Sequence, residues 1–128
     1  MVTADGLSVR VQLLNAQGYP PWPTAVHDIY QRYSDVPPTR LRTPVPDSFA
    51  AWKTAAWFDR RAPRDLYDLW ALALAGALTT SAAHLFATHT GLGLPQDHMF
   101  SRAPVAQDWQ QQLSGQTRLT VSPRKRCR

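Results

Sequence analysis

The sequence holds a single cysteine, Cys127, one residue before the last position. One cysteine cannot form a disulfide within its own chain, and it cannot supply the set of thiolates that structural zinc sites use. A disulfide-stapled scaffold and a cysteine-based metal site are therefore both excluded within one chain. This usage fits a reducing compartment, so we expect a cytoplasmic protein.

Long apolar runs are also missing. The longest lies near residues 69–78, whereas a membrane-spanning helix needs about 20 apolar residues. The first ten residues, MVTADGLSVR, lack an apolar segment behind a basic one, so we expect no secretory signal peptide. The sequence therefore predicts no membrane partner.

Two kinds of metal-binding pattern are absent from the chain as well. Neither Asp-x-Asp nor Asp-x-Glu occurs anywhere, and the six glycines form no Gly-rich loop. The histidines show no metal-ligand spacing, and we interpret all of them as core or surface residues: His27, His84, His89 and His98. From the residues alone we predict no metal site in this chain.

What is present suits one globular domain. The chain has 128 residues, of which 44% are hydrophobic and 18% charged. Its formal net charge of +5 favours an anionic partner such as RNA or a nucleotide. The alternative is a solvated basic end, because five of the fourteen basic residues fall within positions 118–128.

The first third of the chain predicts at most two strands. Apolar and polar residues alternate over residues 7–13, which is typical of a half-buried strand. We expect a short helix over residues 25–33, capped by Thr24, and a short strand at residues 41–43. The first strand either pairs with residues 41–43 or belongs to a sheet whose other strands lie outside this chain, and we favour the second interpretation.

The rest of the chain predicts helices. We expect one over residues 49–60, capped by Asp47 or Ser48, with Phe49, Trp52 and Ala56 as its core face. Pro63 suits the first turn of the next helix, which we expect to continue to residue 78.

Three further segments complete the prediction. A helix over residues 80–90 closes at Gly91 and Gly93, a last short helix covers residues 108–113, and residues 115–128 form a flexible tail. The packing residues that we expect on the helix over residues 63–78 are Leu66, Leu69, Trp70, Leu74 and Leu78.

One constellation points to chemistry. Asp65 and Asp68 are three residues apart, so they share a face of one helix, and Lys53 lies midway along the preceding helix. If the two helices form an antiparallel hairpin, the lysine approaches the carboxylates. A lysine and carboxylates beside Arg61 and Arg64 are suited to a triphosphate, since the lysine neutralises phosphate charge.

Each of these residues also has a purely structural interpretation. Asp65 in a first turn stabilises the helix dipole, and Asp68 can pair with Arg64 one turn earlier. A lysine in the middle of a helix is most often solvated. Trp57, one turn after Lys53, is either a core anchor or a surface on which a base stacks. The spacing alone leaves these alternatives open.

The segment from residue 33 to residue 72, with DSFAAWKTAAWFDRRAPRDLYDLWAL at its centre, resembles the AbiEii/AbiGii nucleotidyltransferase toxin family. That family carries a helix with a lysine and then an R-D-x-x-D helix that ends in an apolar run. Lys53 matches the lysine, and residues 64–68, RDLYD, match R-D-x-x-D. Weaker similarity covers the VRVQLL segment before this stretch and DWQQQLSGQTRL after it.

The resemblance implies an α/β, polymerase-beta-like nucleotidyltransferase that acts as a toxin in toxin–antitoxin or phage-defence systems. Such a protein transfers a nucleotide from an NTP, with Mg²⁺, to an RNA such as tRNA, and a cognate antitoxin is its partner. By resemblance, Lys53 contacts the nucleotide phosphates, with Arg61, Arg64 and Trp57 nearby. Asp65 and Asp68 would be the active-site carboxylates.

The chain departs from the family pattern in its first half. The family's Gly-rich turn and Asp-x-Asp strand are missing, and Ser48 stands where the family often has glutamate. We therefore expect residues 1–128 to be the C-terminal portion of a toxin domain, mostly α with one or two strands before a helical bundle, and inactive alone. The alternatives are a non-catalytic basic module that binds RNA or an antitoxin, and an unstable remnant.

Overall fold

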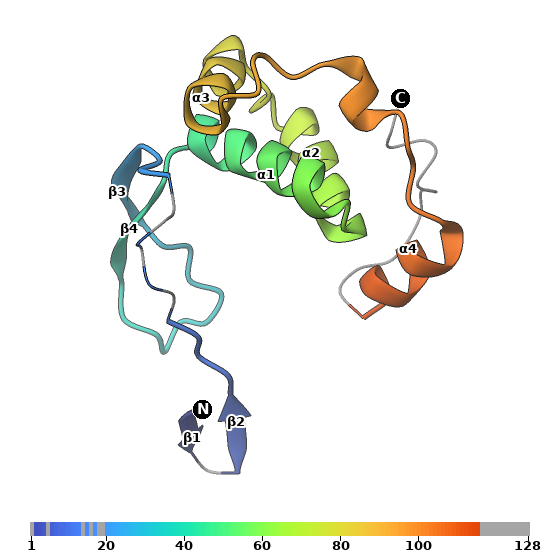
Figure 1. Cartoon of the computed structure of the whole chain (residues 1–128). Coiled ribbons are helices and arrows are strands. Elements are labelled where there is room, and N and C mark those ends of the chain that lie inside the picture. The colour runs from blue at the N-terminus through green and yellow to red at the C-terminus, as the bar shows by residue number, and fades with distance from the viewer. Residues whose placement is uncertain (1, 5, 14, 16, 18–19, 116–128) are drawn as a thin grey trace.

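Two β-hairpins precede a group of helices in the computed structural model, which describes residues 2–4, 6–13, 15, 17 and 20–115 (Figure 1). In the first hairpin β1 (Val2–Ala4) pairs antiparallel with β2 (Leu7–Val9), and in the second β3 (Thr24–Asp28) pairs antiparallel with β4 (Arg40–Pro44). The helices are α1 (Pro46–Arg60), α2 (Pro63–Leu74), α3 (Thr80–Thr90), the 3₁₀ turn η1 (Asp97–Phe100) and α4 (Ala106–Leu113). The predicted class, strands followed by a mostly helical body, is confirmed, although the described residues form four strands where we expected one or two.

The second hairpin corrects one prediction and confirms another. Residues 24–28 form a strand, not the start of the helix that we expected over residues 25–33. The backbone of this segment bonds to the segment at residues 40–44, in a register that places Val26 opposite Arg42. The short strand predicted at residues 41–43 lies inside β4 and supplies that partner. The pairing is long-range, so local spacing could not reveal it.

The strand predicted at residues 7–13 is shorter in the structure and has a different partner from the ones expected. β2 ends at Val9, and its partner is β1. The strand thus pairs neither with residues 41–43 nor, as we favoured, only with strands outside this chain. Gly6, with φ of 79°, takes the left-handed conformation that glycine tolerates in a tight turn, and it lets the chain reverse there. Val11 and Leu13 are exposed, so the expected half-buried face is wrong for them.

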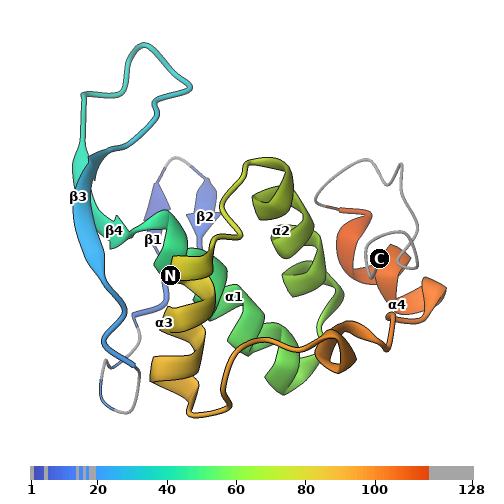
Figure 2. The ribbon, with the colours of Figure 1, turned by 90° about the horizontal axis from the view of Figure 1, so that it is seen from above.

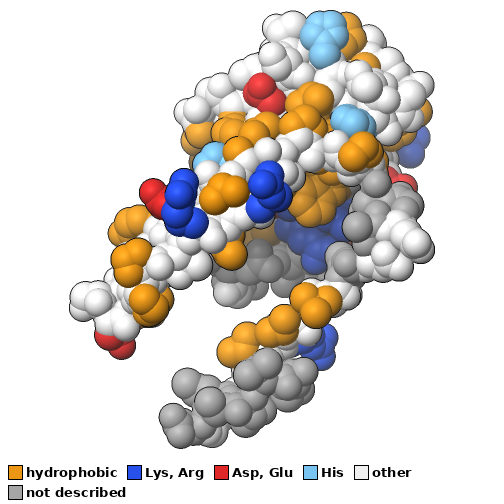
Figure 3. All heavy atoms as spheres, turned by 90° about the vertical axis from the view of Figure 1, so that its left-hand side faces the viewer, with side chains coloured by type: hydrophobic (Ala, Val, Ile, Leu, Met, Phe, Trp, Pro, Cys, Tyr) orange, Lys and Arg blue, Asp and Glu red, His pale blue; other side chains and the backbone are white. Residues whose placement is uncertain are grey.

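The β3–β4 hairpin projects from the helical body, as Figure 2 shows. Val26 and Leu41, one on each strand, are exposed. Figure 3 shows hydrophobic and Arg or Lys side chains side by side on the face of the molecule that carries this hairpin. The hairpin is anchored where Pro23 O accepts bonds from Val45 N at 3.1 Å and from Ser48 Oγ at 2.7 Å.

Helix α1 is the centre of the helical body, and it buries an unexpected face. Its buried residues are mostly small: Ser48, Ala50, Ala51, Thr54 and Trp57. The predicted core face of Phe49, Trp52 and Ala56 is wrong, because small side chains let neighbouring helices approach α1 closely and the aromatic stripe is left outside. The helix begins after Val45 with Pro46 in the first turn, so the cap expected at Asp47 or Ser48 is wrong too.

Two apolar clusters lie on either side of α1. The first joins α1, α2 and α4 through Trp57, Leu66, Leu69, Trp109 and Leu113. The second joins α1, α3 and η1 through Ala51, Phe86 and Met99. Both faces of α1 that meet other helices are therefore filled.

The ends of α2 and α3 differ in how well the sequence predicted them. Helix α2 stops at Leu74, four residues earlier than expected, and Gly76 with φ of 71° redirects the chain. Leu74 and Leu78, which we expected to pack, are exposed, whereas Leu66 and Leu69 are buried as predicted. Helix α3 has the predicted bounds and ends at Gly91, and α4 contains the predicted residues 108–113.

Within the described part of the chain, no helix has both the length and the apolarity to cross a membrane. The predicted tail at residues 115–128 lies, from residue 116 on, outside the described residues.

Two leucines on α2 test which face of that helix is packed. We expect Leu69→Ala to lower the free energy of unfolding by about 3 kcal/mol, because it opens a cavity in the first cluster. The matched control, Leu74→Ala, removes an exposed side chain and should change it by less than about 0.5 kcal/mol. Urea titrations of both variants measure this, and equal losses would contradict the described packing.

Candidate functional site

The hinge between α1 and α2 sets the geometry of the candidate site. Arg61 takes the left-handed conformation, with φ of 53°, and its backbone N–H donates to Trp57 O at 2.9 Å. Ala62 is extended, and Pro63 starts α2 without needing a backbone N–H. Two residues therefore suffice to fold α2 back along α1, as the labelled helices in Figure 2 show.

This hairpin brings Lys53 to the two carboxylates. Its Nζ lies 2.7 Å from Asp68 Oδ2 and 3.6 Å from Asp65 Oδ1. The Lys53 side chain is 17% exposed and that of Asp65 is 0% exposed, so most of this contact is shielded from water. The predicted approach of Lys53 to Asp65 and Asp68 is confirmed.

Arg60 completes the arrangement and was missed as a site residue. Its Nε donates to Asp65 Oδ2 at 2.6 Å and its terminal nitrogen to Asp65 Oδ1 at 2.8 Å. A two-pronged arginine–carboxylate pair is among the strongest polar contacts in proteins. The hydrogen bond that Arg60 donates to Asp65 raises the pKa of Arg60 above its ordinary value, so Arg60 remains charged at physiological pH.

The four charges alternate in sign along the line where α1 packs on α2: Arg60, Asp65, Lys53 and Asp68. We call this line of charges the α1–α2 cleft. Asp65 is buried at the centre with a cation on each side, which offsets the loss of its hydration. Asp68 stands at the outer end with 40% of its side chain exposed. Asp65 is thus placed to hold α1 and α2 together, and Asp68 is the more exposed of the two carboxylates.

The two predicted arginines lie apart from this line of charges. Arg64 is exposed on the first turn of α2, while Asp68, its expected partner, pairs with Lys53. The Arg61 guanidinium donates to Met99 O and lies 5.5 Å from the Trp57 ring centroid and 5.3 Å from that of Phe58. Arg61 therefore fastens η1 to the hinge, whereas Arg64 is open to an incoming anion.

Trp57 lies in the core, which is one of the two interpretations that its position in the sequence left open. Its indole is 0% exposed in the first apolar cluster, and Nε1 donates to Met99 O at 2.9 Å. A buried indole offers no ring face to a base, so its place in the core argues for the anchor interpretation. The aromatic ring beside the lysine is that of Phe49, whose centroid lies 5.5 Å from Lys53 Nζ.

A divalent metal does not fit the cleft as its residues stand. The Lys53 ammonium is the cation that lies between the two carboxylates, and Arg60 binds both oxygens of Asp65. Among the residues that the structure describes, no three His, Cys, Asp or Glu side chains gather as a ligand set. We therefore assign no metal-dependent step to α1 and α2.

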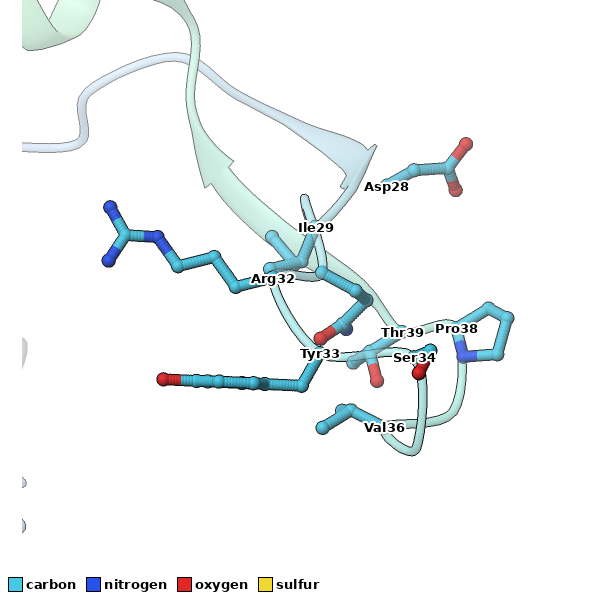
Figure 4. A pocket seen from close by; sticks show the side chains of 9 residues that line it. Asp28, Ile29, Arg32, Tyr33, Ser34, Val36, Pro38 and Thr39 are labelled. Carbon is cyan, nitrogen blue, oxygen red and sulfur yellow. The ribbon is translucent and has the colours of Figure 1, made fainter.

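A hollow of about 460 Å³ lies elsewhere, in the connection between β3 and β4. Figure 4 shows Arg32 and Tyr33 extending toward one side of it, with Asp28 on the other. It contains none of the predicted site residues. We favour the α1–α2 cleft as the functional site because that cleft gathers buried and partly buried charges.

Comparison with known proteins identifies one family. A sequence model described as "Nucleotidyl transferase AbiEii toxin, Type IV TA system" matches residues 3–126. No curated protein and no solved structure matches the chain. The match includes Lys53 and the Arg64–Asp68 segment that first indicated the resemblance, although it assigns no role to any residue.

The two aspartates should differ in their effect on stability. Asp65→Asn leaves Lys53 and Arg60 facing a neutral, buried amide, so we expect a loss of about 3 kcal/mol in unfolding free energy. Asp68→Asn, at a site open to water, should cost less than about 1 kcal/mol. Thermal and urea unfolding measure both, and a larger loss for Asp68→Asn would refute this assignment.

The hinge residue gives a second test. Arg61→Ala and Arg61→Gly lose the same guanidinium contacts, but only glycine adopts the left-handed backbone without strain. We expect the glycine variant to be more stable than the alanine variant by about 1 kcal/mol, measured by urea unfolding. Equal stabilities would show that the hinge backbone is not held in this conformation.

Proposed function

The chain belongs to the AbiEii family of nucleotidyl transferase toxins of type IV toxin–antitoxin systems, and from this premise we propose that its α1–α2 cleft binds the triphosphate of a nucleotide destined for RNA. The acceptor in this proposal is an RNA such as tRNA, and the setting is the cytoplasm, where an antitoxin opposes the toxin. The observation that carries the proposal is the shielded contact of Lys53 with Asp65 and Asp68.

The lysine itself supports this assignment. Twelve of the fourteen basic residues are arginines, and Lys53 is the only lysine within the part of the chain that the structure describes. An arginine fork would serve an ordinary helix surface equally well. A lysine ammonium is compact enough to lie between two carboxylates, and it has a third N–H group besides the two that they can accept. Lysine in this position therefore favours a role in binding a phosphate oxygen.

The ammonium has donors enough for a ligand. Lys53 carries three N–H groups, of which Asp68 takes one at 2.7 Å and Asp65, at 3.6 Å, draws at most another. At least one proton is therefore left for a phosphate oxygen. Arg64 on the first turn of α2 adds an exposed positive charge on the helix that carries Asp68.

Each residue then has a distinct part in the proposed cleft. Asp65 and Arg60 hold the two helices in register, so the Lys53 amine has one position. Lys53 contacts the phosphates and neutralises their charge. Asp68 keeps the ammonium oriented through Oδ2, and its half-exposed carboxylate lies at the mouth of the cleft, where a hydroxyl group of a ligand would approach.

We propose in addition that this chain binds nucleotide without transferring it. Catalytic Mg²⁺ in nucleotidyl transfer requires grouped carboxylates. The sequence contains no Asp-x-Asp pair, and Asp65 is already held by Arg60 and Lys53. Transfer would therefore need carboxylates from a segment outside α1 and α2.

A second candidate is a non-catalytic module that binds RNA. The β3–β4 hairpin favours it, because Arg32, Arg40 and Arg42 are exposed there together with Tyr33. RNA binding that weakens steeply with salt and ignores both nucleotide and Mg²⁺ would select this function over the first.

The nucleotide-binding proposal is tested with Lys53→Met, which removes the ammonium and keeps a chain of similar length. We expect the dissociation constant for an NTP to rise roughly tenfold or more, as a lost charge-assisted hydrogen bond implies. Arg102→Met is the matched control, since it removes an exposed positive charge outside the cleft and should leave binding near the wild-type value. Titration calorimetry with each of the four NTPs measures the constants, and equal binding by Lys53→Met would overturn the proposal.

The transfer proposal is tested with tRNA, Mg²⁺ and each labelled NTP. We expect no label on the RNA with this chain alone. Label should appear when a segment with the family's Gly-rich turn and Asp-x-Asp strand is joined to it. In that active form, Lys53→Ala and Asp65→Ala should abolish transfer. Transfer by this chain alone would contradict the claim that it binds nucleotide without transferring it. Full activity in both variants would contradict the roles assigned to Lys53 and Asp65.

A further inference from the structure

An aromatic stripe on α1, made of the partly buried Phe49 and the exposed Trp52, lies outside both apolar clusters although its spacing is that of a core face. Phe49 and Trp52 lie three residues apart on the helix, and Trp52 is 42% exposed. The two sides of α1 that meet α2 and α3 are filled by the apolar clusters around Trp57 and Phe86. The stripe is therefore not required to complete the core, and its exposure needs another explanation.

The stripe is continuous with the Lys53 cleft. Phe49 is one helical turn before Lys53, and its ring centroid lies 5.5 Å from the ammonium. Trp52 also packs against Phe49, with ring centroids 6.2 Å apart and planes at 81°. One helix thus presents, in order, a positive charge, a ring beside it and a half-exposed indole.

This order matches the two chemical parts of a nucleotide. An ammonium attracts phosphate, and an exposed indole offers a flat surface on which a base stacks. The near-perpendicular rings of Phe49 and Trp52 form a corner, so a base lying on one ring meets the edge of the other. An aliphatic or purely anionic ligand would use only half of this surface.

We propose that Trp52, supported by Phe49, stacks the base of the nucleotide whose phosphates Lys53 binds. This inference rests on the proposed function of the cleft. It moves the base from Trp57, whose indole is buried, to a ring that water reaches. Because every base has a flat face, stacking here tolerates all four bases, and purines bind more tightly than pyrimidines through their larger area.

The experiment compares ATP with inorganic tripolyphosphate, which has the phosphates but no base. Both are titrated calorimetrically into the full chain and into Trp52→Ala, Trp52→Phe and Lys53→Met. We expect Trp52→Ala to weaken ATP binding roughly 5- to 150-fold, the range for one stacked base, and to leave tripolyphosphate binding unchanged. Trp52→Phe, which keeps a ring, should retain most of the ATP affinity.

A matched control removes a different exposed aromatic side chain. Tyr30 is 86% exposed and lies in the connection between β3 and β4, which Figures 1 and 2 both draw away from α2. Tyr30→Ala should bind both ligands as the wild type does. A loss of ATP binding in this variant equal to that of Trp52→Ala would overturn the assignment to Trp52.

The two ligands separate the failure of this inference from that of the proposed function. If Trp52→Ala binds ATP as the wild type does, while tripolyphosphate binding still requires Lys53, the base lies elsewhere and only the stacking inference falls. If Lys53→Met binds tripolyphosphate unchanged, or if the wild type binds neither ligand, the proposed function falls and the stacking inference falls with it.

Discussion

The buried carboxylate of Asp65 is the constraint on which the site depends. A carboxylate without exposure to water is strongly unfavourable unless cations replace its hydration, and here Arg60 binds both oxygens while Lys53 stands 3.6 Å away. Because the two cations come from α1 and the carboxylate from α2, this compensation is available in one register of the helices. The same contacts that make the burial tolerable therefore place the Lys53 amine 2.7 Å from Asp68 Oδ2. Asp65 therefore holds the two helices together, and in the proposed function Lys53 is the group that contacts the phosphates.

Arg60 and Arg61 are adjacent at the hinge, but the change in backbone conformation between them directs their side chains to different partners. Arg60 ends α1 in helical conformation and points to Asp65, whereas Arg61 adopts a left-handed backbone and points to Met99 O and the rings of Trp57 and Phe58. Trp57 donates to the same carbonyl oxygen. The hinge is therefore fastened on one side by the charges of the cleft and on the other by η1. The cleft gains rigidity from contacts that lie outside it, which suits a site that binds phosphate at a fixed point.

The small residues of α1 have a consequence for recognition. Ala50, Ala51 and Thr54 face the neighbouring helices, and their size allows close approach. The larger Trp52 is then left outside, on the surface that continues from Phe49 and Lys53. A helix that packed through its aromatic stripe would have buried the rings of Phe49 and Trp52. In our proposal, the choice of the buried face therefore leaves Trp52 open to stack a base.

The sequence by itself determined what depends on local spacing. Asp65 and Asp68 share a face because they are three residues apart, Gly91 ends α3 because glycine accepts a left-handed backbone, and the family resemblance follows from the lysine and R-D-x-x-D motifs. Only the tertiary structure decided the long-range choices. Helix α1 is apolar on more than one side, so its partners, not its periodicity, selected the buried face and placed Trp57 inside. Likewise, β3 is a strand because it pairs with β4, which follows an eleven-residue connection at residues 29–39. The local pattern of residues 24–28 does not predict this pairing.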